Sequence, residues 1–298
     1  MISLLVAGAF LTQLSEIGTW EHVTVADGLP AEEVRAVLGS STGAVWFAVR
    51  AHGLAVMDQG AWSYYTTADG LVSNGVADLR EVRGAIWAVG QGGYSILRWG
   101  GLEPFTEIGG RATRVVFSLT PSADGVSLWL GASGFAGRWD SDGWTHVDAA
   151  DGLPHSVVHQ ALTGRDDVTW FACRRGLARL RDGTLEVFHP DVNFRSIVED
   201  GAGRLWFGTA GHGVFAYSEG DWEQYLDGQT ILPSVADSEG TIWAITEGAG
   251  VYRYDGEDWT QYTTDDGLLS NVVYDIELAR DGSIWFGTDR GASGLTPR

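Results

Sequence analysis

Apolar and polar residues alternate in short runs along the whole chain, and glycine-containing turns separate the runs. The stretches 34–38, 76–79, 115–119 and 273–278 are examples, and each pattern suits a half-buried β-strand. No window places apolar residues at i, i+3, i+4 and i+7, which excludes helical repeats of similar length. The 42 glycines punctuate the sequence throughout. The pattern therefore predicts an all-β protein built from many short strands.

A tryptophan recurs among these strands at steps of 41, 42, 41, 36, 37 and 42 residues. The seven positions are Trp46, Trp87, Trp129, Trp170, Trp206, Trp243 and Trp285. A period near 40 residues is typical of repeat architectures, and each repeat contains four strand-like runs. We therefore predict a seven-bladed β-propeller with four antiparallel strands per blade. We expect the periodic tryptophans to pack between neighbouring blades, because aromatic side chains dominate core energetics.

The two ends of the chain complement each other. The last repeat ends after its third strand, at 291–296, and the segment 19–25 supplies the strand that is missing there. The ring is thus predicted to close by an N-terminal strand that completes the C-terminal blade, which protects its edge. Residues 19–298 form the predicted propeller domain. Residues 1–18 are an accessory segment whose apolar part, 2–11, is too short to span a bilayer. It is either a signal-peptide core, although it lacks a basic start, or an added strand.

Several phrases repeat beyond the tryptophan itself. Asp-Gly-Leu occurs at 27–29, 69–71, 151–153 and 266–268, and Trp-Phe-Gly-Thr at 206–209 and 285–288. Together with the segment 259–271, these phrases resemble the two-component regulator propeller repeat. The resemblance covers roughly residues 20–298. It implies a propeller that serves as an extracytoplasmic sensor domain, of the kind found in hybrid histidine kinases, often reading carbohydrates. The Asp-Gly-Leu copies themselves are read as tight turns, with leucine plugging the blade interior.

Strand order places the inter-blade loops and the loops after each tryptophan on one face, around the mouth of a central channel. Polar residues that do not follow the repeat gather there, and variable loops on a rigid frame are the usual place for binding. The predicted ligand-binding residues are Arg35, Arg50, His52, Asn74, Arg114, His159, Arg174, Arg195, His212, Asn271 and Tyr274. His155 and His159 do not form a predicted metal pair, since four residues along a strand separate them by roughly 13 Å.

Charge narrows the class of ligand. All 19 basic residues are arginine, against 39 acidic ones, and the net charge is −20. Such a balance disfavours nucleic acid and anionic membranes, which require cationic neutralisation of phosphates. Arginines toward the channel suit a carboxylate or sugar acid. We therefore predict a ligand-binding or sensor propeller that recognises a small molecule or glycan, located in the periplasm or secreted, with a cytoplasmic location as the alternative.

Two other functions are compatible with the sequence. No linear catalytic motif is present, but propeller enzymes assemble their sites from separate blades. The streptogramin B lyases resemble this chain in size and in a Gly-x-x-Trp-Phe element, although they lack its Asp-Gly-Leu connection. Such a lyase or hydrolase would use a histidine as general base and rim carboxylates to hold a divalent cation. A scaffold for protein partners is the third alternative.

Overall fold

The computed structural model describes residues 13–14, 17–98, 101–122, 126–237 and 240–297. Over these residues the chain is antiparallel β-sheet with two 3-10 turns, η1 (Val25–Asp27) and η2 (Thr264–Asp266), and no α-helix. The predicted all-β class is confirmed. None of these segments contains a helix long and apolar enough to cross a membrane. The leader or covering strand expected for residues 1–18 lies outside the described residues, except for β1 (Gln13–Leu14) and residues 17 and 18.

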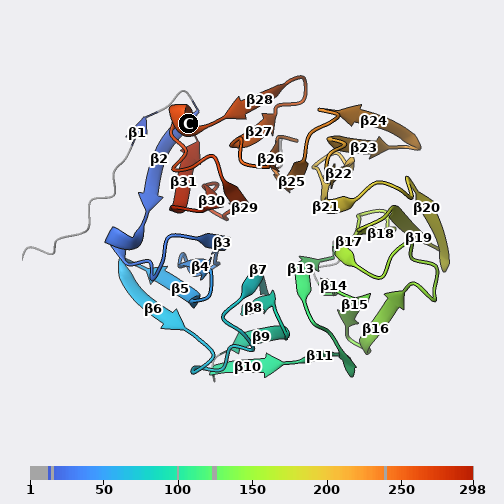
Figure 1. Ribbon diagram of the computed structural model, residues 1–298, viewed down its shortest axis with the longest axis horizontal. Helices are drawn as coiled ribbons and strands as arrows, with labels where there is room; N and C mark the ends of the chain where they lie inside the picture. Colours follow the sequence, from blue (N-terminus) through green and yellow to red (C-terminus); the bar gives the residue numbers. More distant parts are fainter. Residues whose placement is uncertain (1–12, 15–16, 99–100, 123–125, 238–239, 298) are drawn as a thin grey trace, which may run out of the picture.

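Four-stranded antiparallel sheets follow one another around a central opening (Figure 1). The first two are β3 (Val34–Gly39), β4 (Val45–Val49), β5 (Gly53–Asp58), β6 (Ala61–Tyr65), and β7 (Val76–Val82), β8 (Ala85–Gly90), β9 (Gly93–Arg98), β10 (Gly101–Phe105). The next two are β13 (Val116–Pro121), β14 (Leu128–Ala132), β15 (Phe135–Asp140), β16 (Gly143–Asp148), and β17 (Val158–Thr163), β18 (Thr169–Cys173), β19 (Leu177–Arg181), β20 (Thr184–Phe188). A small hairpin, β11 (Glu107–Ile108) and β12 (Arg111–Ala112), connects the second sheet to the third.

The next two strand sets are joined into one larger sheet. They are β21 (Phe194–Glu199), β22 (Leu205–Thr209), β23 (Val214–Ser218), β24 (Asp221–Tyr225), and β25 (Ile231–Ala236), β26 (Ile242–Thr246), β27 (Val251–Tyr254), β28 (Trp259–Tyr262). A single pairing of Thr209 with Ile231 links them. The connection between β24 and β25 is only 226–230, whereas 66–75 separates β6 from β7. The shorter connections before β21 and β25 account for the two short steps, 36 and 37, in the tryptophan period.

The two ends of the chain meet in the remaining sheet. It contains β29 (Val273–Leu278), β30 (Ile284–Thr288) and β31 (Gly291–Pro297), followed by β2 (Gly18–Val23) and β1. β2 pairs antiparallel with β31, with Trp20 opposite Leu295, and the two strands lie side by side in Figure 1. Trp20 is fully buried against Phe286 of β30, at 5.5 Å between ring centroids. The N-terminal strand is therefore part of the hydrophobic core of this sheet.

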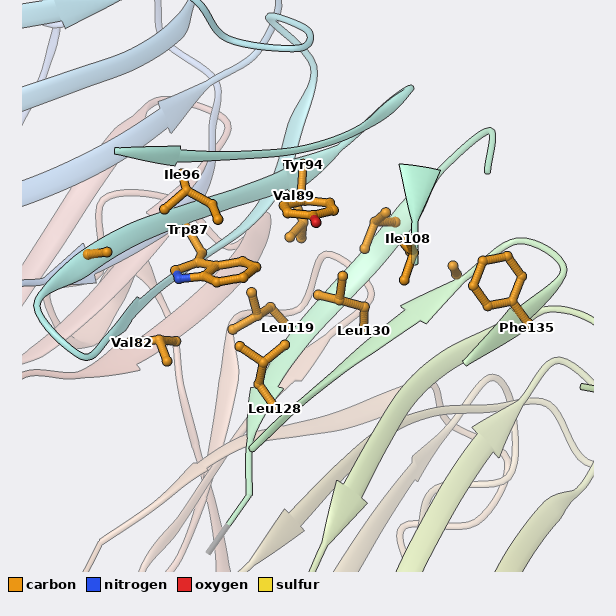
Figure 2. Close-up of a cluster of buried hydrophobic side chains, with 13 residues drawn as sticks. Val82, Trp87, Val89, Tyr94, Ile96, Ile108, Leu119, Leu128, Leu130 and Phe135 are labelled. Atoms are coloured by element: carbon orange, nitrogen blue, oxygen red, sulfur yellow. The ribbon is translucent and has the colours of Figure 1, made fainter. Parts of the chain in front are cut away.

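The periodic tryptophans are all buried and lie between sheets, as predicted. Trp129, Trp170, Trp243 and Trp285 each contact a phenylalanine of the next sheet around the ring, namely Phe171, Phe207, Phe286 and Phe47. The hydrophobic clusters accordingly span sheet pairs. Figure 2 shows one of them, in which Trp87 and Tyr94 from one sheet pack toward Leu119 and Leu130 of the next. The burial of hydrophobic side chains between neighbouring sheets is thus the main contribution to the stability of the ring.

The Asp-Gly-Leu segments are capped turns. At η2, Asp266 accepts hydrogen bonds from the backbone N–H and the hydroxyl of Thr263, and the Thr263 hydroxyl accepts one from Asp265 N–H. The same arrangement recurs at Thr24, at Thr66 and, with aspartate in the cap position, at Asp148. The leucine of each copy is buried. These carboxylates are committed to the turn, so the repeat itself is structural.

The glycine of the turn is required for two reasons, which a pair of substitutions separates. Gly267 has φ +113°, and a Cβ there would lie 2.4 Å from the Trp20 ring, whereas Gly256, at φ +104°, would meet nothing within 4 Å. We expect Gly256→Ala to cost about 1 kcal/mol from backbone strain alone. Gly267→Ala should cost about 1–3 kcal/mol more, because Trp20 is overpacked. Urea unfolding followed by tryptophan fluorescence measures both; equal losses would show that the contact with Trp20 does not constrain this turn.

Candidate functional site

A shared backbone irregularity shapes the channel mouth. In β3, β7, β13, β17, β21 and β29, the pairing with the second strand shifts by one residue immediately after the first pair. Such a bulge re-aims the side chain of the extra residue. The residues skipped by the register are Arg35, Ala77, Phe117, His159, Arg195 and Tyr274. In β25 the shift comes later, between Pro233 and Val235, and Leu232 holds the corresponding place.

A cavity of about 680 Å³ opens at this mouth. Four of the predicted site residues line it: Arg35, Arg50, Arg195 and Tyr274. Gln91, Val115, Leu232 and Glu247 line it as well. Ala77 and Leu232 were missed as members of the site because an apolar residue at a bulge carries no polar signal in the sequence. The volume is within the range of small-molecule sites.

One wall of the cavity contains two arginines that share one carboxylate partner. Arg35 lies over the Tyr274 ring, 4.0 Å from its centroid, and forms an ion pair with Glu33. Arg50 Nη1 donates to the other oxygen of Glu33 at 2.7 Å. Burial opposes ionisation of Glu33, but its hydrogen bond to Arg50 and the charges of both arginines outweigh burial and lower its pKa. This wall offers an aromatic surface and a fixed guanidinium plane, and Glu33 neutralises one of its two positive charges.

The opposite sector carries uncompensated positive charge. Within the described part of the chain, Arg114, Arg174 and Arg195 have no carboxylate partner. Burial, reinforced by the charges of Arg195 and Arg174, lowers the pKa of His159 to about 4. His159 is therefore neutral at pH 7. Its ring packs edge-to-face with that of Phe117, with 5.3 Å between the ring centroids. Arg195 is the member of this sector that reaches the cavity.

The remaining predicted residues lie outside the cavity lining, which does not include His52, Asn74, Arg114, His159, Arg174, His212 or Asn271. Asn74 and Asn271 accept hydrogen bonds from the backbone N–H of Thr67 and Thr264. Both stand five residues after the aspartate of a capped turn, so these two asparagines brace the same loop in two repeats. The His52 ring bonds the Arg50 carbonyl, at 2.8 Å. The structure thus brings together four of the eleven candidates.

A second polar group lies deeper, on the same inner strands, and its residues are not among the predicted site residues. Arg80 Nη1 is 3.2 Å from Asp78 Oδ1 and 3.3 Å from Glu277 Oε2, so it links β7 to β29. Asp78 accepts a hydrogen bond from Leu119 N–H, and Asp275 accepts one from Val37 N–H. Each of these two carboxylates therefore connects its own sheet to the next one around the ring.

This inner group, Asp78, Arg80, Asp275 and Glu277, contains three carboxylates and one guanidinium. Burial raises the pKa of Asp275 to about 6 and that of Glu277 to about 7, although the charge of Arg80 opposes both shifts. Among the described residues, no three His, Cys, Asp or Glu side chains are grouped so that they could hold a metal ion. The inner group is thus a proton-sensitive network of charges.

Two segments of the chain match a known repeat family. The sequence profile of the two component regulator propeller matches residues 189–211 and 267–290, which contain the two Trp-Phe-Gly-Thr phrases. These two segments are two-component regulator propeller repeats. The resemblance seen in the sequence is confirmed. Curated proteins give no match to this sequence.

Several solved structures are similar in fold to this chain. The extracellular domain of the hybrid two-component system BT4673 from B. thetaiotaomicron superposes with a TM-score of 0.77 at 21% identity, over 94% of this chain and 40% of its own. That of BT3049 gives 0.77 at 19% identity, over 97% and 42%. The chain therefore spans about 40% of the length of these extracellular domains. A streptogramin B lyase gives 0.71 at 20% identity, over 94% of this chain and 97% of the lyase. These likenesses show an all-β propeller.

Proposed function

We propose that residues 19–298 form a single seven-bladed propeller, closed by the pairing of β2 with β31. The support is the succession of four-stranded sets around the opening and the antiparallel register from Gly18 to Val23 along β31. Closure leaves no free edge on the last blade. A rigid ring of this kind holds the bulged residues of different blades at fixed positions around one cavity.

The function that this geometry supports best is recognition of a small ligand at the channel mouth, as in a sensor domain. The single observation that carries the proposal is the 680 Å³ cavity between the Arg35–Tyr274 wall and the unpaired Arg195. A sugar ring stacks on an aromatic surface, and an acidic group pairs with a free guanidinium. We therefore assign a carbohydrate or sugar acid as the ligand. The structural relatives from hybrid two-component systems are extracellular domains, which supports an extracytoplasmic location.

The exposed surface favours a small ligand over a scaffold role. Among the described residues, the exposed large apolar side chains are Val25, Tyr64, Val126 and Val187. Val25 lies in η1, Tyr64 in β6, Val126 in the connection before β14 and Val187 in β20, so these residues do not make one broad apolar patch of the kind that protein interfaces use.

A glucuronate-containing disaccharide and its neutral counterpart test the proposal. We expect the acidic sugar to raise the midpoint of thermal unfolding, because a ligand that binds only the folded state stabilises it. Arg195→Ala should weaken binding of this sugar by about tenfold or more, through the loss of a charge-assisted contact. Arg175→Ala is the matched control, since Arg175 is exposed but does not line the cavity. Equal binding by the Arg195 and Arg175 variants, or no shift with either sugar, would overturn the proposal.

A lyase is the second candidate, favoured by the nearly complete mutual coverage with the streptogramin B lyase. His159 would be the base, but a pKa of about 4 makes its imidazole a weak proton acceptor at neutral pH. Incubation with a streptogramin B and Mg²⁺, followed by mass spectrometry, separates the two functions. Turnover that His159→Ala abolishes would establish the lyase, whereas an unchanged substrate supports the binding function.

A further inference from the structure

The turn between β7 and β8 is shorter than its counterparts in other sheets. It consists of two residues, Arg83 and Gly84, both with positive φ, +52° and +75°. The equivalent connections 40–44, 164–168, 200–204 and 279–283 each have five residues. A pocket of about 240 Å³ opens at this shortened turn, lined by Val82, Arg83, Gly84, Ala85, Trp87, Arg98 and Trp139. This turn pocket lies at the opposite end of β7 from the channel mouth, between the second and third sheets.

The floor of the turn pocket presents an unused hydrogen-bond donor. Trp87 is only 3% exposed, and its indole N–H has no partner among the described residues. Trp46 and Trp170 also lack one, but their nitrogens are fully enclosed, whereas that of Trp87 is not. Buried tryptophan nitrogens usually find an acceptor. In Figure 2 the nitrogen of Trp87 is drawn on the side of Val82, another residue of the pocket.

The lack of a partner for Trp87 has a cause in the sequence. At the next junction around the ring, Trp129 Nε1 donates to Thr163 Oγ1 at 2.8 Å. Thr163 pairs with the residue before Trp170, and Pro121 pairs with the residue before Trp129, so the two occupy equivalent positions. Proline offers no side-chain acceptor. The third sheet therefore leaves the Trp87 N–H available to a molecule in the pocket.

The walls of the turn pocket add positive charge and an aromatic face. The Arg83 guanidinium lies 5.1 Å from the centre of the Trp139 ring and donates to Val126 O at 2.9 Å. Arg98 is exposed, and its side chain has no hydrogen-bond or ion-pair partner among the described residues. Trp139 stands where other sheets have Met57, Leu97, Leu180 or Tyr217, so the wide indole is specific to this junction.

We infer that the turn pocket is a second ligand site, which binds a small flat carboxylate. The carboxylate group of this ligand accepts a hydrogen bond from the Trp87 N–H and pairs with Arg98, while the apolar part of the ligand stacks on Trp139. The volume is below that of drug-sized sites, which fits a ligand of the size of benzoate. The site is separate from the channel mouth and does not depend on what binds there.

Titration with benzoate, observed through the indole N–H resonances in NMR, tests this inference. Trp87→Phe assigns the resonance of interest by removing it. We expect benzoate to shift the Trp87 signal in a saturable way, and Arg98→Ala to weaken binding by about tenfold. Arg280→Ala is the control, because Arg280 is an exposed arginine in the connection between β29 and β30 and does not line the turn pocket. Neutral benzamide should shift the signal little.

Three outcomes would overturn the second site. The first is a Trp87 resonance that does not move at millimolar benzoate. The second is an equal response to benzoate and benzamide, which would remove the role of the positive charge. The third is equal weakening by Arg98→Ala and Arg280→Ala, which would show that only the overall charge of the protein matters.

Discussion

Replacing Arg80 with methionine should lower the free energy of unfolding by about 2–4 kcal/mol at pH 8, because removal of one partner leaves buried charges uncompensated. Arg80 contacts Asp78 and Glu277, and the side chains of the three residues are 12–25% exposed. Its removal leaves three carboxylates facing one another inside the channel. Methionine keeps most of the length of the side chain, so the loss reports the charge rather than the volume.

The sign of the pH dependence follows from the raised pKa values. Asp275 and Glu277, at about 6 and 7, bind protons more tightly in the folded state than in the unfolded chain. Their contribution to stability is therefore complete below the unfolded pKa, near 4, and is lost as pH rises through 6–7. The wild-type protein should gain stability, on the order of 1–3 kcal/mol, between pH 8 and pH 5. The penalty of Arg80→Met should shrink over the same interval.

Urea unfolding at fixed pH values, followed by tryptophan fluorescence, measures both effects. Glu277→Gln removes one of the titrating groups and should flatten the slope between pH 8 and pH 5. Glu257→Gln removes the same formal charge at an exposed site, so it corrects for the general repulsion of a protein with net charge −20. A slope that both glutamine variants leave unchanged would show that the inner charges do not control stability in this range.

The repeat made the fold predictable, because each blade uses the same residues for the same contacts. The tryptophan period, the Asp-Gly-Leu turns and the Trp20 strand each follow from packing that recurs along the chain. Departures from the repeat were harder to interpret. The shortened turn at Arg83 and Gly84 and the proline at 121 are visible in the sequence, but their meaning depends on which side chains face them from the next sheet.

The candidate site was predictable only in part, for reasons of geometry. Arg35, His159, Arg195 and Tyr274 share one bulged position, and all four are recognisable in the sequence because they are polar or aromatic and do not repeat. Whether such a residue reaches the cavity depends on the neighbouring loops, which sequence periodicity does not describe. Asp78, Asp275 and Glu277 were missed because a carboxylate in an alternating strand is normally read as solvent-facing. Here the other face of the strand is the channel.

The contribution of a single buried hydrogen bond can be isolated by comparing two tryptophans in matched settings. Trp170 and Trp206 are both 1% exposed. Each has an arginine over its ring, Arg179 or Arg204, and each also contacts an aromatic ring of the next sheet. They differ in the indole N–H. That of Trp206 donates to Asp200 Oδ2 at 2.9 Å, whereas that of Trp170 has no partner among the described residues.

Trp170→Phe should therefore lower the free energy of unfolding by about 1–2 kcal/mol, because it removes only the buried ring atoms by which tryptophan exceeds phenylalanine. Trp206→Phe should cost about 1.5–3 kcal/mol more, because it also leaves Oδ2 of the buried Asp200 carboxylate without its indole donor. Asp200 additionally accepts from the N–H groups of Ala202 and Arg204, so Asp200→Ala alone is destabilising for a different reason. The double variant Trp206→Phe/Asp200→Ala closes a cycle that removes this second effect. A coupling energy near zero would mean that the Trp206–Asp200 bond adds nothing to stability, and that packing between blades alone decides the cost of losing either tryptophan.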